Sequence, residues 1–85
     1  MTRTIRSEGQ EALIRSLTEA RKAAGLTQAE LAGRLRCHQS FVARVESGQR
    51  RIDVAELVIL SRALGADPVQ LLTAVMAAVP GDARI

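Results

Sequence analysis

The segment Thr27-Gln-Ala-Glu-Leu-Ala-Gly-Arg-Leu-Arg-Cys-His-Gln-Ser-Phe-Val-Ala-Arg-Val-Glu-Ser-Gly48 decides the fold of this 85-residue chain. It predicts two short helices with about four residues between them, a link too short for the helices to lie antiparallel. The second helix carries several polar side chains that packing does not require. When two helices are joined at such an angle, the first can lie across a DNA backbone while the second enters the major groove.

Capping residues set the ends of the predicted helices. Thr27 and Glu30 form a capping box at the start of the first helix of the segment, which we expect to end near Leu35. The second helix covers residues 38–47 and is followed by Gly48. Working outward, we predict three further helices: one ended by Gly25, one from Asp53 to Gly65, and one from Asp67 to Pro80. Five helices joined by short turns indicate a compact all-α fold.

Charge and composition limit the classes of binding partner and the cellular compartment that we expect for this protein. Residues 1–51 hold ten Arg/Lys and five Asp/Glu, a net charge of +5, whereas residues 52–85 hold two and four, a net charge of −2. This asymmetry indicates that the first half meets a polyanion. No apolar run reaches the roughly 20 residues that span a bilayer, and the N-terminus lacks the apolar core of a signal peptide. A lone Cys37 offers no disulfide framework, so we expect a cytoplasmic protein.

Several motifs together resemble the Cro/repressor-type helix-turn-helix family, also called the XRE family. They are Leu26-Thr-Gln-Ala-Glu-Leu-Ala32, then Val42, Val45, Glu46 and Gly48, and the downstream Leu64-Gly-Ala-Asp-Pro68. The resemblance implies a five-helix lambda-repressor-like DNA-binding domain over residues 8–79, with the helix-turn-helix motif at about 27–46. Residues 1–7 are then expected to form a flexible arm and residues 80–85 a flexible C-terminus. A bacterial or phage origin, with the protein at the nucleoid, follows from the same resemblance.

The resemblance also implies which side chains meet DNA. Base contacts are expected from the exposed face of the third helix, namely His38, Gln39, Ser40, Ala43 and Arg44. There Gln39 can pair with adenine N6 and N7, and Arg44 with guanine O6 and N7. Contacts to the DNA backbone are expected from Gln28, Ser47, Gln49, Arg50 and Arg51. The alternative is that the third helix shows an ordinary solvated face.

Other positions are expected to support the motif. Arg21 and Glu46 match a family pair that forms a buried ion pair behind the third helix; the alternative is two solvated charges. Arg36 stands where the family usually has Gly, so either Arg36 takes a left-handed conformation at about 1–2 kcal/mol or the turn differs locally. Cys37 is expected to be a buried apolar plug, and His38 to cap the third helix weakly.

The function that the resemblance implies is sequence-specific binding of double-stranded DNA. The protein would be a transcriptional regulator, a repressor, that binds a palindromic operator as a dimer. The alternative is a protein-interaction module of the same fold, similar to an antitoxin, whose DNA binding is secondary. His38 is the only histidine, and no Asp, Glu or Cys stands at ligand spacing from it, so we expect no metal, no cofactor and no enzymatic activity.

The fifth helix offers a surface for dimerisation. Its apolar residues spread over more of the circumference than docking on a monomer core requires. We expect Val69 and Leu72 to face the core, and Val75, Met76 and Val79 to form the dimer interface.

Overall fold

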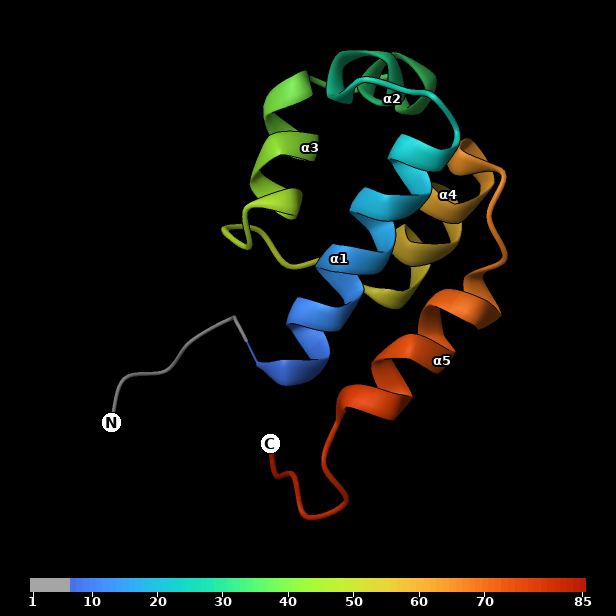
Figure 1. The fold of residues 1–85 in the computed structure, drawn as a ribbon. Coiled ribbons are helices and arrows are strands. Elements are labelled where there is room, and N and C mark those ends of the chain that lie inside the picture. The colour runs from blue at the N-terminus through green and yellow to red at the C-terminus, as the bar shows by residue number, and fades with distance from the viewer. Residues whose placement is uncertain (1–6) are drawn as a thin grey trace.

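The computed structural model describes residues 7–85, and within that range the fold consists of five helices: α1 (Glu8–Ala23), α2 (Gln28–Leu35), α3 (Gln39–Glu46), α4 (Val54–Leu64) and α5 (Pro68–Ala78). The predicted all-α, five-helix architecture is confirmed. Residues 1–6 of the expected N-terminal arm lie outside the described residues, and Ser7 caps α1 by accepting a hydrogen bond from the Gln10 amide. Figure 1 shows α1 running through the middle of the molecule, with α2 and α3 at one end and α5 along the other.

The helix starts follow the predicted capping chemistry. The capping box expected at α2 is present, Thr27 with Glu30, and a second one joins Asp53 and Glu56 at α4. Asp67 caps α5, with Pro in the first turn, where a missing N–H costs nothing. His38 caps α3 without a side-chain hydrogen bond, as the sequence led us to expect. These contacts satisfy amide groups that have no partner inside their own helix.

The ends of α1 to α4 share one geometry, in which a left-handed residue closes the last turn, whereas α5 ends at Val79 in an extended conformation. Gly25, Gly48 and Gly65 all have positive φ, and so does Arg36 after α2, at φ 57 and ψ 45. At that position the amides of Arg36 and Cys37 donate to the carbonyls of Gly33 and Ala32, at 3.2 and 3.0 Å, which is the Schellman arrangement. Of the two alternatives for the turn, Arg36 therefore bears the left-handed strain.

The core lies where the five helices meet, and α5 contributes Leu71 to it. Leu17, Leu31, Val42, Val45 and Leu60 are all less than 5% exposed. Leu31 and Val42 come from α2 and α3, so packing in the core holds these two helices at a fixed angle to each other. It also fixes the rotation of α3, whose other face points to solvent. Among residues 7–85, no helix combines the length and apolar character needed to cross a membrane.

Helix α5 lies along α1, with a rotation different from the expected one. Its buried residue is Leu71, 7% exposed, whereas Val69 and Leu72 are 65% and 47% exposed, so the expectation that these two face the core is wrong. The close approach at Gly9 helps to set the rotation. A methyl group at Gly9 would come within 2.6 Å of Val79 Cγ2 and 3.4 Å of Val75 Cγ1. Val75 and Val79 therefore lie against the start of α1, where Val75 is half-buried and Val79 is still 44% exposed.

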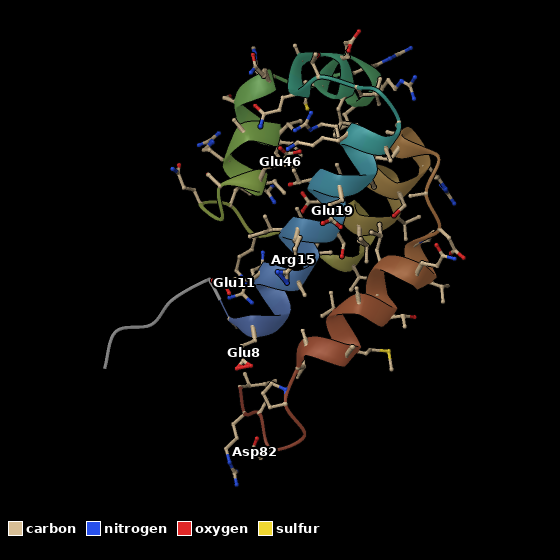
Figure 2. All side chains as sticks on the ribbon, viewed as in Figure 1. Glu8, Glu11, Arg15, Glu19, Glu46 and Asp82 are labelled. Atoms are coloured by element: carbon tan, nitrogen blue, oxygen red, sulfur yellow. The ribbon has the colours of Figure 1, made fainter. Side chains whose placement is uncertain are left out.

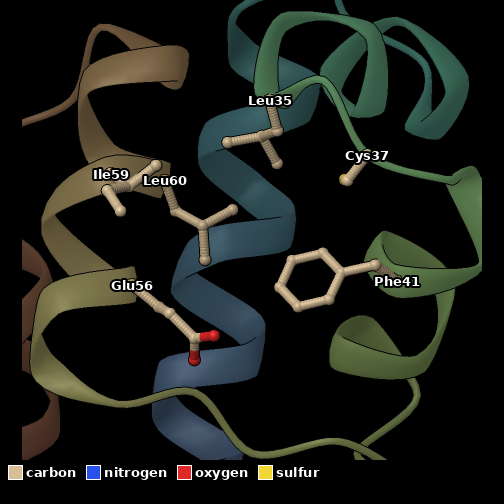
Figure 3. A pocket seen from close by; sticks show the side chains of 6 residues that line it. All are labelled: Leu35, Cys37, Phe41, Glu56, Ile59 and Leu60. Atoms are coloured by element: carbon tan, nitrogen blue, oxygen red, sulfur yellow. The ribbon is translucent and has the colours of Figure 1, made fainter.

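The expected buried position of Cys37 is also wrong, because Cys37 is exposed. The helix cap ties its backbone amide to Ala32, and the side chain lies at the mouth of a cavity of about 190 Å³ between α2, α3 and α4. Figure 3 shows Leu35, Phe41 and Leu60 around this space, with the Cys37 side chain at its edge.

Candidate nucleic-acid interface

The outer face of α3 presents the side chains that the sequence suggested for base contact. His38, Gln39, Ser40 and Arg44 are exposed and Ala43 is half-buried. Val42 and Val45, on the opposite face, are 2% and 3% exposed and lie in the core. The helix thus places polar groups outward and is fixed from behind, as a reading surface requires.

A nearly buried ion pair lies behind α3. Arg21 of α1 donates from Nε to Glu46 Oε2 at 2.7 Å and from Nη2 to Oε1 at 3.0 Å, and the side chains are only 11% and 10% exposed. Its third nitrogen donates to the Leu26 carbonyl at 2.8 Å. The hydrogen bonds to Glu46 raise the pKa of Arg21. Figure 2 shows Glu46 beside α1 on the inner side of α3, so the charges tie α1 to α3 as the resemblance implied.

Gln28 connects the Arg21–Glu46 ion pair to the outer face of α3, which we call the reading face. Its Nε2 donates to Glu46 Oε1 at 2.9 Å, and its Oε1 accepts from Gln39 Nε2 at 3.4 Å. The sequence suggested Gln28 for the DNA backbone and gave no sign of these contacts, since no local spacing relates residue 28 to residue 46. The structure thus assigns Gln28 a contact on each side, and it remains half-buried at the N-terminus of α2.

The loop after α3 divides the residues proposed for backbone contact. Gln49 and Arg51 are exposed, and Ser47 is half-buried, with its hydroxyl donating to the Arg44 carbonyl at 3.2 Å. Arg51 keeps its charge at the surface beside the end of α3. Ser47, Gln49 and Arg51 therefore keep polar groups at the surface of the loop after α3.

Arg50 is placed differently from Arg51. Its guanidinium pairs with both carboxylate oxygens of Glu56, at 2.9 Å each, donates to the Arg51 carbonyl, and stacks 4.9 Å from the centre of the Phe41 ring. Hydrogen bonding between the two side chains lowers the pKa of Glu56 and raises that of Arg50. Arg50 thus ties the loop to α3 and α4, a structural role that the sequence analysis missed.

The distribution of the remaining charges bounds the candidate surface. Arg34 donates to the Ala63 carbonyl at 2.9 Å, near the end of α4, where free carbonyls attract a cation. Figure 2 shows Glu8, Glu11 and Glu19 along α1, away from the turn between α2 and α3. Arg15 lies among these three residues, so this side of α1 is mixed in charge, with three carboxylates to one guanidinium. Within residues 7–85, no three His, Cys, Asp or Glu side chains gather closely enough to hold a metal ion.

The chain is similar to a known protein family and to several solved structures. A family model described as helix-turn-helix matches residues 17–71. An XRE-family like protein from Pseudomonas syringae pv. tomato is 47% identical, with a TM-score of 0.77 over 85% of this chain and 88% of that one. The restriction-modification controller protein C.AhdI from Aeromonas hydrophila is 34% identical, with a TM-score of 0.67 over 73% of this chain and 90% of that one.

A third solved structure extends the similarity to a lower identity. The clp gene regulator ClgR from C. glutamicum is 27% identical, with a TM-score of 0.73 over 82% of this chain and 90% of that one. No curated protein sequence matches the chain.

Proposed function

The chain belongs to the XRE family of helix-turn-helix DNA-binding regulators, and we propose that it is a repressor that binds a palindromic operator as a homodimer. In this proposal α3 enters the major groove. His38, Gln39, Ser40, Ala43 and Arg44 then face the bases. Gln28, Ser47, Gln49 and Arg51 approach the phosphates, and occupation of the operator blocks transcription.

The outward face of α3 is the observation that carries the proposal. Gln39 and Arg44 are exposed on a helix whose other face is locked into the core. Within residues 7–85 the Arg44 guanidinium makes one long hydrogen bond, from Nε to the Ser40 carbonyl at 3.4 Å, so it can turn to a base. Arginine pairs with guanine O6 and N7, and glutamine with adenine N6 and N7, in the major groove. Neither side chain contributes to the core in its present position.

Selection of bound sequences from random duplexes tests the proposal. The parent protein should yield a palindromic motif. Arg44→Ala and Gln39→Ala should each lose about 1–3 kcal/mol of specific binding and relax one base position. Arg62→Ala, which removes an exposed charge from α4, is the matched control and should retain the full motif. Equal losses on selected and random duplexes would refute base contact by α3.

We propose that the homodimer forms through the outward stripe of α5. Val69, Leu72 and Met76 are 65%, 47% and 67% exposed and recur at spacings of three and four residues, so they share one helix face. Of the interface suggested from the sequence, Met76 lies in this stripe and Val79, 44% exposed, lies at its end, whereas Val75 is half-buried against α1. A second copy of the same stripe would cover these side chains and pair two half-sites about 10 bp apart.

Sedimentation of Leu72→Glu and Met76→Glu variants tests the interface. Each should shift the protein to monomer and weaken operator binding, because a buried unpaired charge opposes association. Gln70→Glu is the control: it adds the same charge to α5, on a side about 120° from the centre of the stripe. Folded variants that remain as dimeric as the parent would exclude this stripe, and a monomeric parent would exclude the homodimer.

A protein-interaction module of the same fold is the second candidate. The observation in its favour is the same apolar stripe on α5, which could receive another protein in place of a second copy. Selection that yields no motif from the parent would favour this candidate over the regulator.

A further inference from the structure

A chain of hydrogen bonds connects the ion pair behind α3 to a side chain on its reading face. It runs from Arg21 to Glu46, from Glu46 to Gln28, and from Gln28 to Gln39. The first two links measure 3.0 and 2.9 Å, and the last is long, at 3.4 Å. The last link therefore orients the Gln39 amide more than it holds it in place.

The polarity of this chain is fixed at Glu46. An ionised carboxylate only accepts hydrogen bonds, so the end of Gln28 that faces Glu46 has to be its NH₂ group. The carbonyl oxygen of Gln28 is then turned to Gln39, and it can only accept. Gln39 must in turn direct an N–H of its own amide at Gln28, because the opposite orientation would set two amide oxygens against each other.

We infer that Glu46, acting through Gln28, is a specificity-determining positioning residue that sets which way the Gln39 amide reads a base. The inference rests on the proposed function, in which Gln39 reaches a base edge. With one N–H directed at Gln28, Gln39 keeps one N–H and its carbonyl oxygen for DNA, and no hydrogen bond within residues 7–85 uses that oxygen. One donor beside one acceptor is the complement of adenine, which presents N7 as acceptor and N6 as donor.

The fixed polarity also disfavours guanine at the same base pair. Guanine presents two acceptors, N7 and O6, and the outward oxygen of Gln39 would face one of them. An amide free to rotate could instead direct both N–H groups at guanine and its oxygen back toward Gln28. Removing the carboxylate at residue 46 gives that freedom, since a glutamine there offers either a donor or an acceptor to Gln28.

Three variants separate this effect from a general loss of structure. Glu46→Gln keeps the shape of the side chain but removes the fixed polarity. Gln28→Met removes the amide between Glu46 and Gln39 and leaves the Arg21–Glu46 pair intact. Gln70→Met is the matched control, an exposed glutamine on α5 that takes no part in these contacts.

The measurement is selection from random duplexes, followed by titration of the selected site and its single adenine-to-guanine variant. The parent should prefer adenine at one position by about 5- to 150-fold, as one paired contact provides. Glu46→Gln and Gln28→Met should both reduce this ratio, with the other positions unchanged, and Gln70→Met should not. Gln28→Met should also leave the slope of log K against log salt as in the parent, because no charge changes.

The possible outcomes distinguish a failure of the proposed function from a failure of the positioning role of Glu46. If the parent selects no motif, the proposed function itself is refuted. A parent motif whose adenine preference survives in folded Glu46→Gln and Gln28→Met refutes the positioning role alone. An equal loss at every position of the motif would also overturn it, because Glu46 and Gln28 would then have no particular effect on the base that Gln39 reads. Thermal melts of each variant establish that it is folded before its ratio is compared.

Discussion

Replacing Arg21 by methionine tests how much the ion pair behind α3 stabilises the fold. Methionine has a similar length and no charge, so the change leaves the Glu46 carboxylate about 10% exposed without its cation. It also removes the hydrogen bond to the Leu26 carbonyl. Breaking a buried pair on one side costs about 3–5 kcal/mol. An 85-residue domain has a total of roughly 4–13 kcal/mol at 0.05–0.15 kcal/mol per residue, so most of the stability is at risk.

The assay is urea and thermal unfolding followed by circular dichroism, at one protein concentration because a dimer's stability depends on it. We expect the melting temperature to fall by at least about 12 °C, given some 4–8 °C per kcal/mol in a domain of this size. Arg62→Met, at an exposed site, is the matched control and should stay within about 0.5 kcal/mol of the parent. A loss for Arg21→Met below about 1 kcal/mol would match a surface pair and refute the buried-pair argument.

Three further predictions concern single side chains. Arg51→Ala should reduce the slope of log K against log salt by about one unit, whereas Arg50→Ala should lower the unfolding free energy, because Arg50 holds Glu56 and Phe41; the opposite pattern would exchange their roles. The lowered pKa of Glu56 means that its contribution is complete at pH 7, declines as the pH falls below about 4.5 and is lost below the lowered value; the stability gap between the parent and Glu56→Gln should therefore close in acid, and a constant gap would contradict this. Arg36→Gly should raise the melting temperature by relieving about 1–2 kcal/mol of left-handed strain, less the roughly 0.4–1 kcal/mol that glycine adds to unfolded-chain entropy; a lower melting temperature would show that the side chain contributes more than the strain costs.

The helix boundaries could be predicted because the interactions that set them are local. A capping box joins residues three apart, as Thr27 and Glu30 show, and its partners can be identified from the sequence alone. The closing turns at Gly25 and Gly65 depend in the same way on a few residues and on tolerance of positive φ. Even the strain at Arg36 was one of two alternatives that the sequence offered, and the structure selects it.

The rotation of α5 could not be predicted, because its sequence is apolar on nearly every side. A helix with a single apolar stripe identifies its buried face, but α5 carries apolar residues at most of its positions, so periodicity gives no direction. The contact with Gly9 of α1 selects Val75 and Val79 instead of Val69 and Leu72. That choice depends on a residue about 70 positions earlier in the chain, where no local pattern indicates it.

The candidate site was predictable in its exposed residues and not in its polar contacts. The motif implied that Gln39 and Arg44 would be exposed on α3, and they are. It did not imply that Arg50 would pair with Glu56, or that Cys37 would be left at the mouth of a cavity. A guanidinium in a loop can reach phosphate, carboxylate or an aromatic ring, and only the tertiary arrangement decides among them.

In our proposal the Arg21–Glu46 pair affects both the stability of the fold and the orientation of the Gln39 amide. A double replacement separates these two effects. Substituting both partners with apolar residues, as in Arg21→Met with Glu46→Leu, removes the unpaired charge, and such exchanges are often neutral or stabilising. The double variant should recover much of the stability that Arg21→Met loses. It should not recover the adenine preference, because Gln28 then faces no carboxylate and its amide can turn either way. Recovery of both properties would show that Glu46 matters only for stability; recovery of stability alone would mean that the charge is needed to orient the reading face of α3.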